Sequence, residues 1–152
     1  MNNVKIVNRK LTTHESNRMD KGFDELYHEE GIELESYEKV SFVAEIENRF
    51  IGCSSGLAFK NGENYSGWFH LTDLFVEKGN RSKGFGKLLL QTTEMQITSL
   101  GIKHIFLWTS GEKAIKFYER QGYKKFSEME SWYSDGSSRV GLRKNLSAIS
   151  RP

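Results

Sequence analysis

The feature that most restricts the fold is a glycine-rich turn between a long apolar strand and a helix. Residues 67–77 combine aromatic and apolar residues over a length typical of a strand. The turn follows as Glu77-Lys-Gly-Asn-Arg-Ser-Lys-Gly-Phe-Gly-Lys87, and a helical repeat then runs to Gly101. A second apolar strand occupies residues 104–109. This order favours parallel pairing of the two strands through a right-handed crossover.

The helix after the turn should present one apolar stripe to the sheet. Apolar residues and one threonine recur there at three- and four-residue spacing, and the predicted stripe is Phe85, Leu88, Leu89, Thr92 and Met95. A second helix, residues 112–121, stops at Gly122.

The remaining segments predict a mainly antiparallel sheet. Residues 40–46 and 50–59 form a predicted hairpin that leads into the long strand, and the run 123–133 turns through Asp135-Gly136 into 139–143. Near the start, Val4–Val7 alternates like a short strand. The predicted fold class is α/β (α+β), with a mixed, mainly antiparallel central sheet of six or seven strands and flanking helices.

A helix is also predicted between the first short strand and the hairpin. Thr12-Thr-His-Glu15 matches a capping box, in which the Thr side chain caps the helix and the Glu side chain reaches back. Met19, Phe23, Leu26 and Tyr27 then form one apolar face, and Gly31 is the expected stop.

Size and composition predict one domain. The chain has 152 residues and no linker-like tract, which gives a single domain over residues 1–147 and a short tail at 148–152. Cys53 is the only cysteine, so it cannot form an intrachain disulfide, and its apolar surroundings favour a small buried thiol over a nucleophile. The sequence contains no run long enough for a membrane span and no secretory signal, so we expect no membrane partner and a cytoplasmic location.

Charge is divided along the chain. Residues 14–47 are strongly acidic, and residues 78–125 are strongly basic. Solvated helix faces alone could explain this division. It also suits an anionic ligand in the second half and a cationic ligand near the first.

The glycine turn fits one phosphate-binding design better than two others. A P-loop would need Lys and Ser/Thr after Gly84, where Phe85 and Gly86 stand. A dinucleotide fingerprint would need a small residue in place of Leu89. Arg81-x-x-Gly84-x-Gly86 remains, in which the N–H groups of the first helical turn can bind a diphosphate. Lys83 and Lys87 would add charge around it, although such lysines can equally be solvated.

Two patterns in order make the chain resemble the GNAT superfamily of N-acetyltransferases. The first is Arg81-Ser-Lys-Gly84-Phe-Gly86. The second is Ala114-Ile-Lys-Phe-Tyr118-Glu-Arg-Gln-Gly122-Tyr123, about thirty residues later. The resemblance covers roughly residues 4–146 and implies the acetyl-CoA N-acyltransferase fold, with acetyl-CoA as cosubstrate and no metal.

The resemblance also implies roles for individual residues. Tyr118 matches the tyrosine that protonates the departing thiolate, and an acceptor amine attacks the thioester directly without a covalent enzyme intermediate. The expected cofactor-binding residues are the strand segment, the turn and one helix residue, namely Leu74, Phe75, Val76, Arg81, Ser82, Lys83, Gly84, Phe85, Gly86, Lys87 and Phe117. The other reading of Tyr118 is that it packs the helix against the sheet, and Phe117 is read as core packing or as packing beside the adenine.

Other parts of the site are less defined by the resemblance. Gly111 stands where family members often have an asparagine that bonds the pantetheine arm. Asp73 is the expected general base because it precedes the segment beside the acetyl group, and His70, Glu77 or a water relay are alternatives. Four aromatic residues could line an acceptor pocket or simply belong to the core, namely Trp68, Trp108, Trp132 and Tyr133.

We expect the acceptor to be the primary amine of a cationic small molecule, such as a polyamine, an aminoglycoside-type antibiotic or an amino acid. The alternatives are a protein or peptide amine, or a noncatalytic sensor of acyl-CoA. A nucleic-acid partner is not expected, because the basic residues surround a turn better explained by CoA phosphates. The family frequently dimerises, which keeps a homodimer among the expectations.

Overall fold

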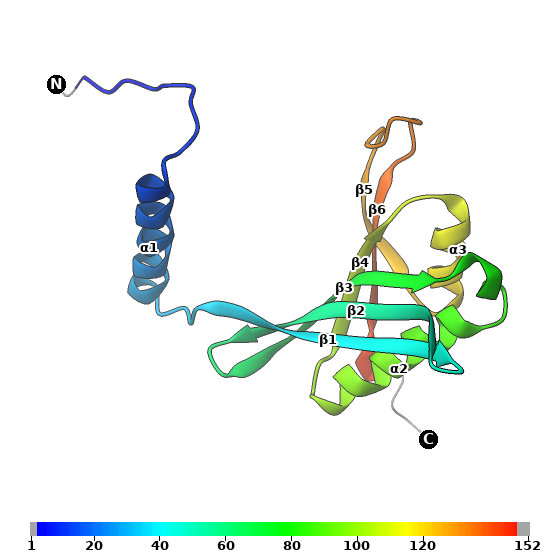
Figure 1. Ribbon diagram of the computed structural model, residues 1–152. Coiled ribbons are helices and arrows are strands. Elements are labelled where there is room, and N and C mark those ends of the chain that lie inside the picture. The colour runs from blue at the N-terminus through cyan, green and yellow to red at the C-terminus, as the bar shows by residue number, and fades with distance from the viewer. Residues whose placement is uncertain (1–2, 149–152) are drawn as a thin grey trace. The chain divides into compact units, whose positions relative to one another are not determined.

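The computed structural model describes residues 3–148 and divides the chain into two compact units, Met1–Leu34 and Glu35–Pro152. Figure 1 labels the helices and strands of both units. Of the tail expected at residues 148–152, residue 148 closes a 3-10 turn, Leu146–Ala148, and residues 149–152 lie outside the described part.

The first unit contains one helix, α1 (Thr13–Glu29). Its predicted capping box is confirmed, because Glu15 N–H donates to the Thr12 hydroxyl at 3.1 Å and Thr12 N–H donates to the Glu15 carboxylate at 2.9 Å. Gly31 adopts φ +70° just after the helix, as a helix stop requires. The strand predicted at Val4–Val7 is wrong, because these residues have no neighbouring strand to pair with.

The second unit contains the six-stranded sheet. Its strands are β1 (Glu35–Ile46), β2 (Arg49–Asn61), β3 (Asn64–Val76), β4 (His104–Thr109), β5 (Lys124–Met129) and β6 (Arg139–Asn145). They lie in the order β1-β2-β3-β4-β6-β5 (Figure 1). Only β3 and β4 pair in parallel, and every other neighbouring pair is antiparallel. The mixed, mainly antiparallel sheet predicted from the sequence is confirmed.

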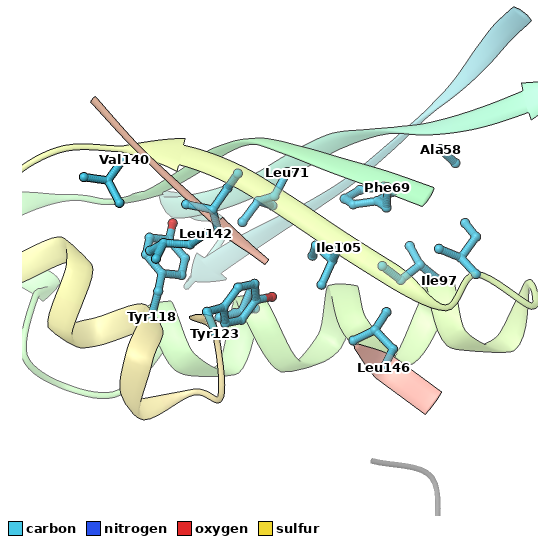
Figure 2. Close-up of a cluster of buried hydrophobic side chains, with 13 residues drawn as sticks. Ala58, Phe69, Leu71, Ile97, Ile105, Tyr118, Tyr123, Val140, Leu142 and Leu146 are labelled. Carbon is cyan, nitrogen blue, oxygen red and sulfur yellow. The ribbon is translucent and has the colours of Figure 1, made fainter. Parts of the chain in front are cut away.

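Two helices cover one face of this sheet. α2 (Phe85–Ser99) follows β3, and α3 (Glu112–Arg120) follows β4. The core lies between these helices and the strands, as Figure 2 shows. Its larger members come from the sheet, from the two helices and from the residues that directly follow α3 and β6: Phe69, Leu71, Leu90, Ile97, Ile105, Leu107, Tyr118, Tyr123, Leu142 and Leu146.

The predicted apolar stripe of α2 is displaced by about one position. The buried residues of this helix are Leu89, Leu90, Thr93, Glu94 and Ile97. Leu88 and Met95 are exposed instead, at 60% and 74%. Three consecutive leucines, residues 88–90, made it impossible to tell from the sequence which side of the helix faces the core. The side that does so buries the Thr93 hydroxyl and the Glu94 carboxylate, and both groups have partners elsewhere in the fold. Thr93 bonds to Ser54 of β2 at 2.7 Å, and Glu94 pairs with Lys144 of β6 at 2.9 Å.

Candidate functional site

An extra residue in β3 creates the site. Ser55 of β2 is opposite Asp73, whereas the next residue, Gly56, is opposite Leu71, so Thr72 is a β-bulge. Such a bulge bends the strand and changes which face the following side chains take. Here it places Asp73 on the same face as His70, away from the helices.

Beyond the bulge, β3 and β4 separate. Their pairing ends at His70 opposite Phe106, although β3 continues to Val76 and β4 to Thr109. The polar groups of β3 that would otherwise face β4 are therefore free for another partner. A cavity of about 250 Å³ opens between the strands, lined by Leu71, Thr72, Asp73, Leu74 and Phe75 of β3, by Leu107, Trp108 and Thr109 of β4, and by Tyr118 of α3.

Tyr118 is the residue of α3 that lines this cavity. Its side chain is buried, and the hydroxyl points toward the strands (Figure 2). Among the described residues, no side-chain hydrogen bond occupies this hydroxyl, although a buried tyrosine hydroxyl normally has a partner. Burial raises the pKa of Tyr118 to about 12, so the phenol keeps its proton at neutral pH.

The glycine turn leads from β3 into α2. After a 3-10 turn, Lys78–Asn80, Ser82 and Gly84 take positive φ values of 63° and 86°. Gly84 is the N-cap, and no side chain caps the helix. The first N–H groups of α2 therefore have no acceptor within the helix, and the positive end of the helix dipole adds to their attraction for an anion.

Basic side chains surround this helix start. Arg81 donates from Nε to the carbonyl oxygen of Val76 at 3.0 Å, which fixes the arginine beside the end of β3. Within residues 3–148, neither Arg81 nor Lys83 nor Lys87 forms an ion pair with an acid. The turn thus presents uncompensated positive charge next to unbonded N–H groups.

Phe117 connects the turn to the cavity. Its ring contacts Tyr118 edge to face, with centroids 5.1 Å apart. A Cβ added at Gly86 would lie 3.6 Å from the same ring, which is ordinary contact. Protein packing therefore does not require glycine at position 86.

The two candidate bases lie together at the start of the separation. Asp73 is exposed, and its Oδ2 accepts a hydrogen bond from the Thr72 hydroxyl at 2.8 Å. Burial lowers the pKa of His70, the Arg139 cation lowers it further, and Asp73 acts in the opposite sense. The His70 imidazole is therefore neutral at pH 7. Glu77, the third candidate, lies beyond the end of β3. Of the three candidates, only Asp73 lines the cavity.

Gly111 caps α3 with φ 85° and ψ 137°, a conformation that favours glycine. An asparagine at this position would be strained, so the local backbone accounts for its absence.

Sequence reasoning missed Arg139. Its guanidinium lies over the rings of Trp108 and Trp132, at 5.1 and 5.3 Å from their centroids. Both tryptophans were acceptor-pocket candidates, whereas Trp68 stacks on His104, 4.5 Å away, further along the sheet. A lone arginine at the start of a strand has no signal in the sequence.

In residues 3–148, no group of three or more His, Cys, Asp or Glu side chains is placed to hold a metal ion. None of the helices in this part of the chain is long and apolar enough to cross a membrane.

Comparisons with known proteins identify the family and the fold of this chain. The family model described as an acetyltransferase (GNAT) domain matches residues 38–125, which is more than half of the chain. A curated relative, the L-ornithine N5-acetyltransferase NATA1 of Arabidopsis thaliana, is 28% identical over 121 residues, covering 77% of this chain and 53% of the relative. The chain thus spans about half the length of that relative.

Solved structures share the fold. An acetyltransferase from Bacillus cereus ATCC 14579 has a TM-score of 0.74 at 23% identity, covering 93% of this chain and 97% of its own. An aminoglycoside 6'-N-acetyltransferase complexed with coenzyme A has a TM-score of 0.63 at 20% identity, covering 76% of each chain.

Proposed function

The chain belongs to the GNAT acetyltransferase family, and from this premise we propose that it transfers the acetyl group of acetyl-CoA to a primary amine. The observation that carries the proposal is the position of two features along β3. The unpaired edge of the strand begins after His70, and the unbonded start of α2 follows a few residues after the strand ends. A thioester arm and a diphosphate can occupy these two features at the same time.

Each cofactor contact has a proposed partner. The diphosphate would bind the N–H groups of Phe85, Gly86 and Lys87, with charge from Arg81 and Lys83 and close approach at Ser82 and Gly84. The pantetheine arm would pair with the backbone of Leu74, Phe75 and Val76. Of these three, Leu74 and Phe75 line the cavity. Phe117 would pack between the arm and the turn.

The transfer needs a base for the acceptor ammonium and an acid for the departing thiolate. The acceptor ammonium first loses a proton to a base, for which we propose Asp73 with His70 beside it. The amine nitrogen then attacks the thioester carbon, whose developing oxyanion is stabilised by β3 N–H groups. The carbon–sulfur bond breaks, Tyr118 gives its proton to the thiolate, and the second amine proton leaves to solvent, from which the Tyr118 phenolate regains a proton. The products are the amide and free CoA.

The acceptor we propose is a small molecule with a primary amine. The relative named as an ornithine acetyltransferase and the structure named as an aminoglycoside acetyltransferase support this class. A protein or peptide amine and a noncatalytic sensor are the alternatives. The single domain over residues 1–147, a homodimer, the absence of a nucleic-acid partner and a cytoplasmic location stay predictions.

The test is release of CoA from acetyl-CoA in the presence of single amines: ornithine, lysine, putrescine, spermidine, kanamycin and a short peptide with a free N-terminus. Products should be identified by mass spectrometry, because the Cys53 thiol would also react with a thiol reagent. Acetylation of a small amine supports the proposal. Acetylation of the peptide alone contradicts the small-molecule class, and tight acetyl-CoA binding without any transfer favours the sensor.

A further inference from the structure

The face of the sheet opposite α2 and α3 carries a set of aromatic and basic side chains. Alternation along β3, β4 and β6 places Leu71, Leu107 and Val140 in the core, so their strand neighbours point the other way. Those neighbours include His70, Trp108 and Arg139. All three are half-buried, and Trp108 lines the cavity where the acceptor amine is proposed to react.

Arg139 is held by two aromatic rings. Its guanidinium lies 5.1 Å from the centroid of Trp108 and 5.3 Å from that of Trp132. Contacts of this kind occupy the faces of the guanidinium plane and leave its edges, which carry the N–H donors. Those edges match a carboxylate, which can accept two parallel hydrogen bonds from an arginine.

The donors of Arg139 have no partner in the described protein. Its Nε is buried without a hydrogen bond, and its side chain forms no ion pair with any acid of residues 3–148. Leaving a buried charged donor unsatisfied is costly, and such groups in a native protein usually have a ligand, ion or water as partner.

Arg139 is also close enough to the reacting groups to influence them. Trp108 lines the cavity together with Asp73, and the Arg139 guanidinium lies 5.1 Å from the centroid of the Trp108 ring. One acceptor can therefore place an amine near Asp73 and an anionic group on Arg139.

From these contacts we infer that the acceptor carries a carboxylate, which binds the edge of the Arg139 guanidinium while the amine faces Asp73 and His70. The inference rests on the proposed acetyl transfer and narrows its substrate class to amino acids with a reactive amine. It makes Arg139 a specificity-determining residue and excludes simple diamines as preferred acceptors.

The test uses acceptors that differ only in the carboxylate. Ornithine and putrescine share a terminal amine, and lysine and cadaverine form a second pair. For the wild-type protein, kcat/KM should be 10- to 100-fold higher for the amino acid of each pair, as expected for charged hydrogen bonds. In Arg139→Met this ratio should fall to near one through a rise in KM for the amino acids, and KM for acetyl-CoA should not change.

Arg143→Met is the matched control. Arg143 lies on the same strand and face, over Trp68 at 4.7 Å, opposite Phe106 where β3 and β4 are still paired. Removing this cation changes the net charge equally and should preserve the ratio. If Arg143→Met removes the preference for amino acids as fully as Arg139→Met does, the preference comes from general charge attraction, which contradicts the specific pairing with Arg139 that we infer.

Calorimetric titration of the same acceptors into protein loaded with CoA provides a readout independent of turnover. Ornithine should bind more tightly than putrescine, and Arg139→Met should remove the difference. Equal binding and equal turnover of both members overturn the inference without affecting the proposed acetyl transfer. Absence of transfer to every amine, with selective carboxylate binding retained, contradicts the proposed activity and keeps the carboxylate site.

Discussion

Tyr118 is the residue that we propose as proton donor to the departing thiolate. It lines the cavity between β3 and β4, and burial raises its pKa to about 12. The phenol therefore stays protonated at neutral pH, which a proton donor requires. The raised pKa also makes proton transfer to a thiolate of pKa about 8.5 uphill, so the donation that we propose has to accompany cleavage of the carbon–sulfur bond.

Replacing Tyr118 by phenylalanine should lower kcat by about 10² to 10⁴-fold, the usual contribution of a positioned acid. Thermal stability should stay nearly constant, because no side-chain hydrogen bond of the described residues is lost. Steady-state kinetics and thermal melting measure the two effects.

Tyr123→Phe is the matched control. The Tyr123 hydroxyl donates to Glu94 at 2.8 Å in the core, so its loss should cost about 1–3 kcal/mol of stability and leave kcat within a few-fold. Unchanged kcat in Tyr118→Phe would assign this residue to core packing, the alternative that the sequence left open.

At the level of elements, α2 connects the glycine turn to the rest of the fold through a buried charge. Glu94 accepts from Lys144 of β6 at 2.9 Å and from Tyr123 at 2.8 Å. The Glu94 and Lys144 side chains are only 9% and 15% exposed. Removing one partner of such a pair leaves the other charge buried and unpaired.

Lys144→Met should therefore lower the free energy of unfolding by about 3–5 kcal/mol. The double variant Glu94→Gln, Lys144→Met should recover a large part of this loss, since no unpaired charge remains. Urea denaturation of the two single variants and the double variant measures the coupling. Additive losses would show that the pair does not contribute as a unit.

The same elements show what the sequence could predict. The six strands of the sheet, the three helices, the capping box of α1 and the glycine turn depend on local patterns, and the structure has them near the expected places. The strand expected at Val4–Val7 is absent because alternation alone does not supply a pairing partner. The buried face of α2 depends on Lys144, fifty residues away, so a polar Glu94 could not be recognised as a core residue. The bulge at Thr72 was missed for a similar reason, because it appears only in the pairing with Ser55 and Gly56.

The candidate site residues also divide into those that a local sequence pattern predicts and those that only the folded chain brings together. Two sequence patterns predicted the turn and Tyr118, because each pattern is continuous along the chain. Arg139 becomes a candidate only when β6 pairs beside β4 and the loop after β5 brings Trp132 over it. The acidic segment 14–47 led us to expect a cationic acceptor. That expectation gave no indication of an arginine that could bind an anionic group of the acceptor.

For the whole molecule, the division into Met1–Leu34 and Glu35–Pro152 has a testable consequence. Every buried apolar residue of the described chain lies between Ile51 and Leu146, and α1 contains none. All the proposed acetyl-CoA contacts also lie in the second unit. A protein consisting of residues 35–152 should therefore contain a complete core and a complete cofactor site.

We predict that this shortened protein unfolds cooperatively and binds acetyl-CoA within about threefold of the full chain, a difference below 1 kcal/mol. Calorimetric titration of both proteins measures their affinity for acetyl-CoA, and urea denaturation measures the cooperativity of unfolding. Gly84→Ala in each protein provides a negative control. Alanine at a φ of 86° is strained at the helix start that should hold the diphosphate, so both Gly84→Ala proteins should bind acetyl-CoA more weakly. If the shortened protein fails to fold, residues 1–34 complete the core. If it folds without binding acetyl-CoA, those residues contribute directly to the cofactor site.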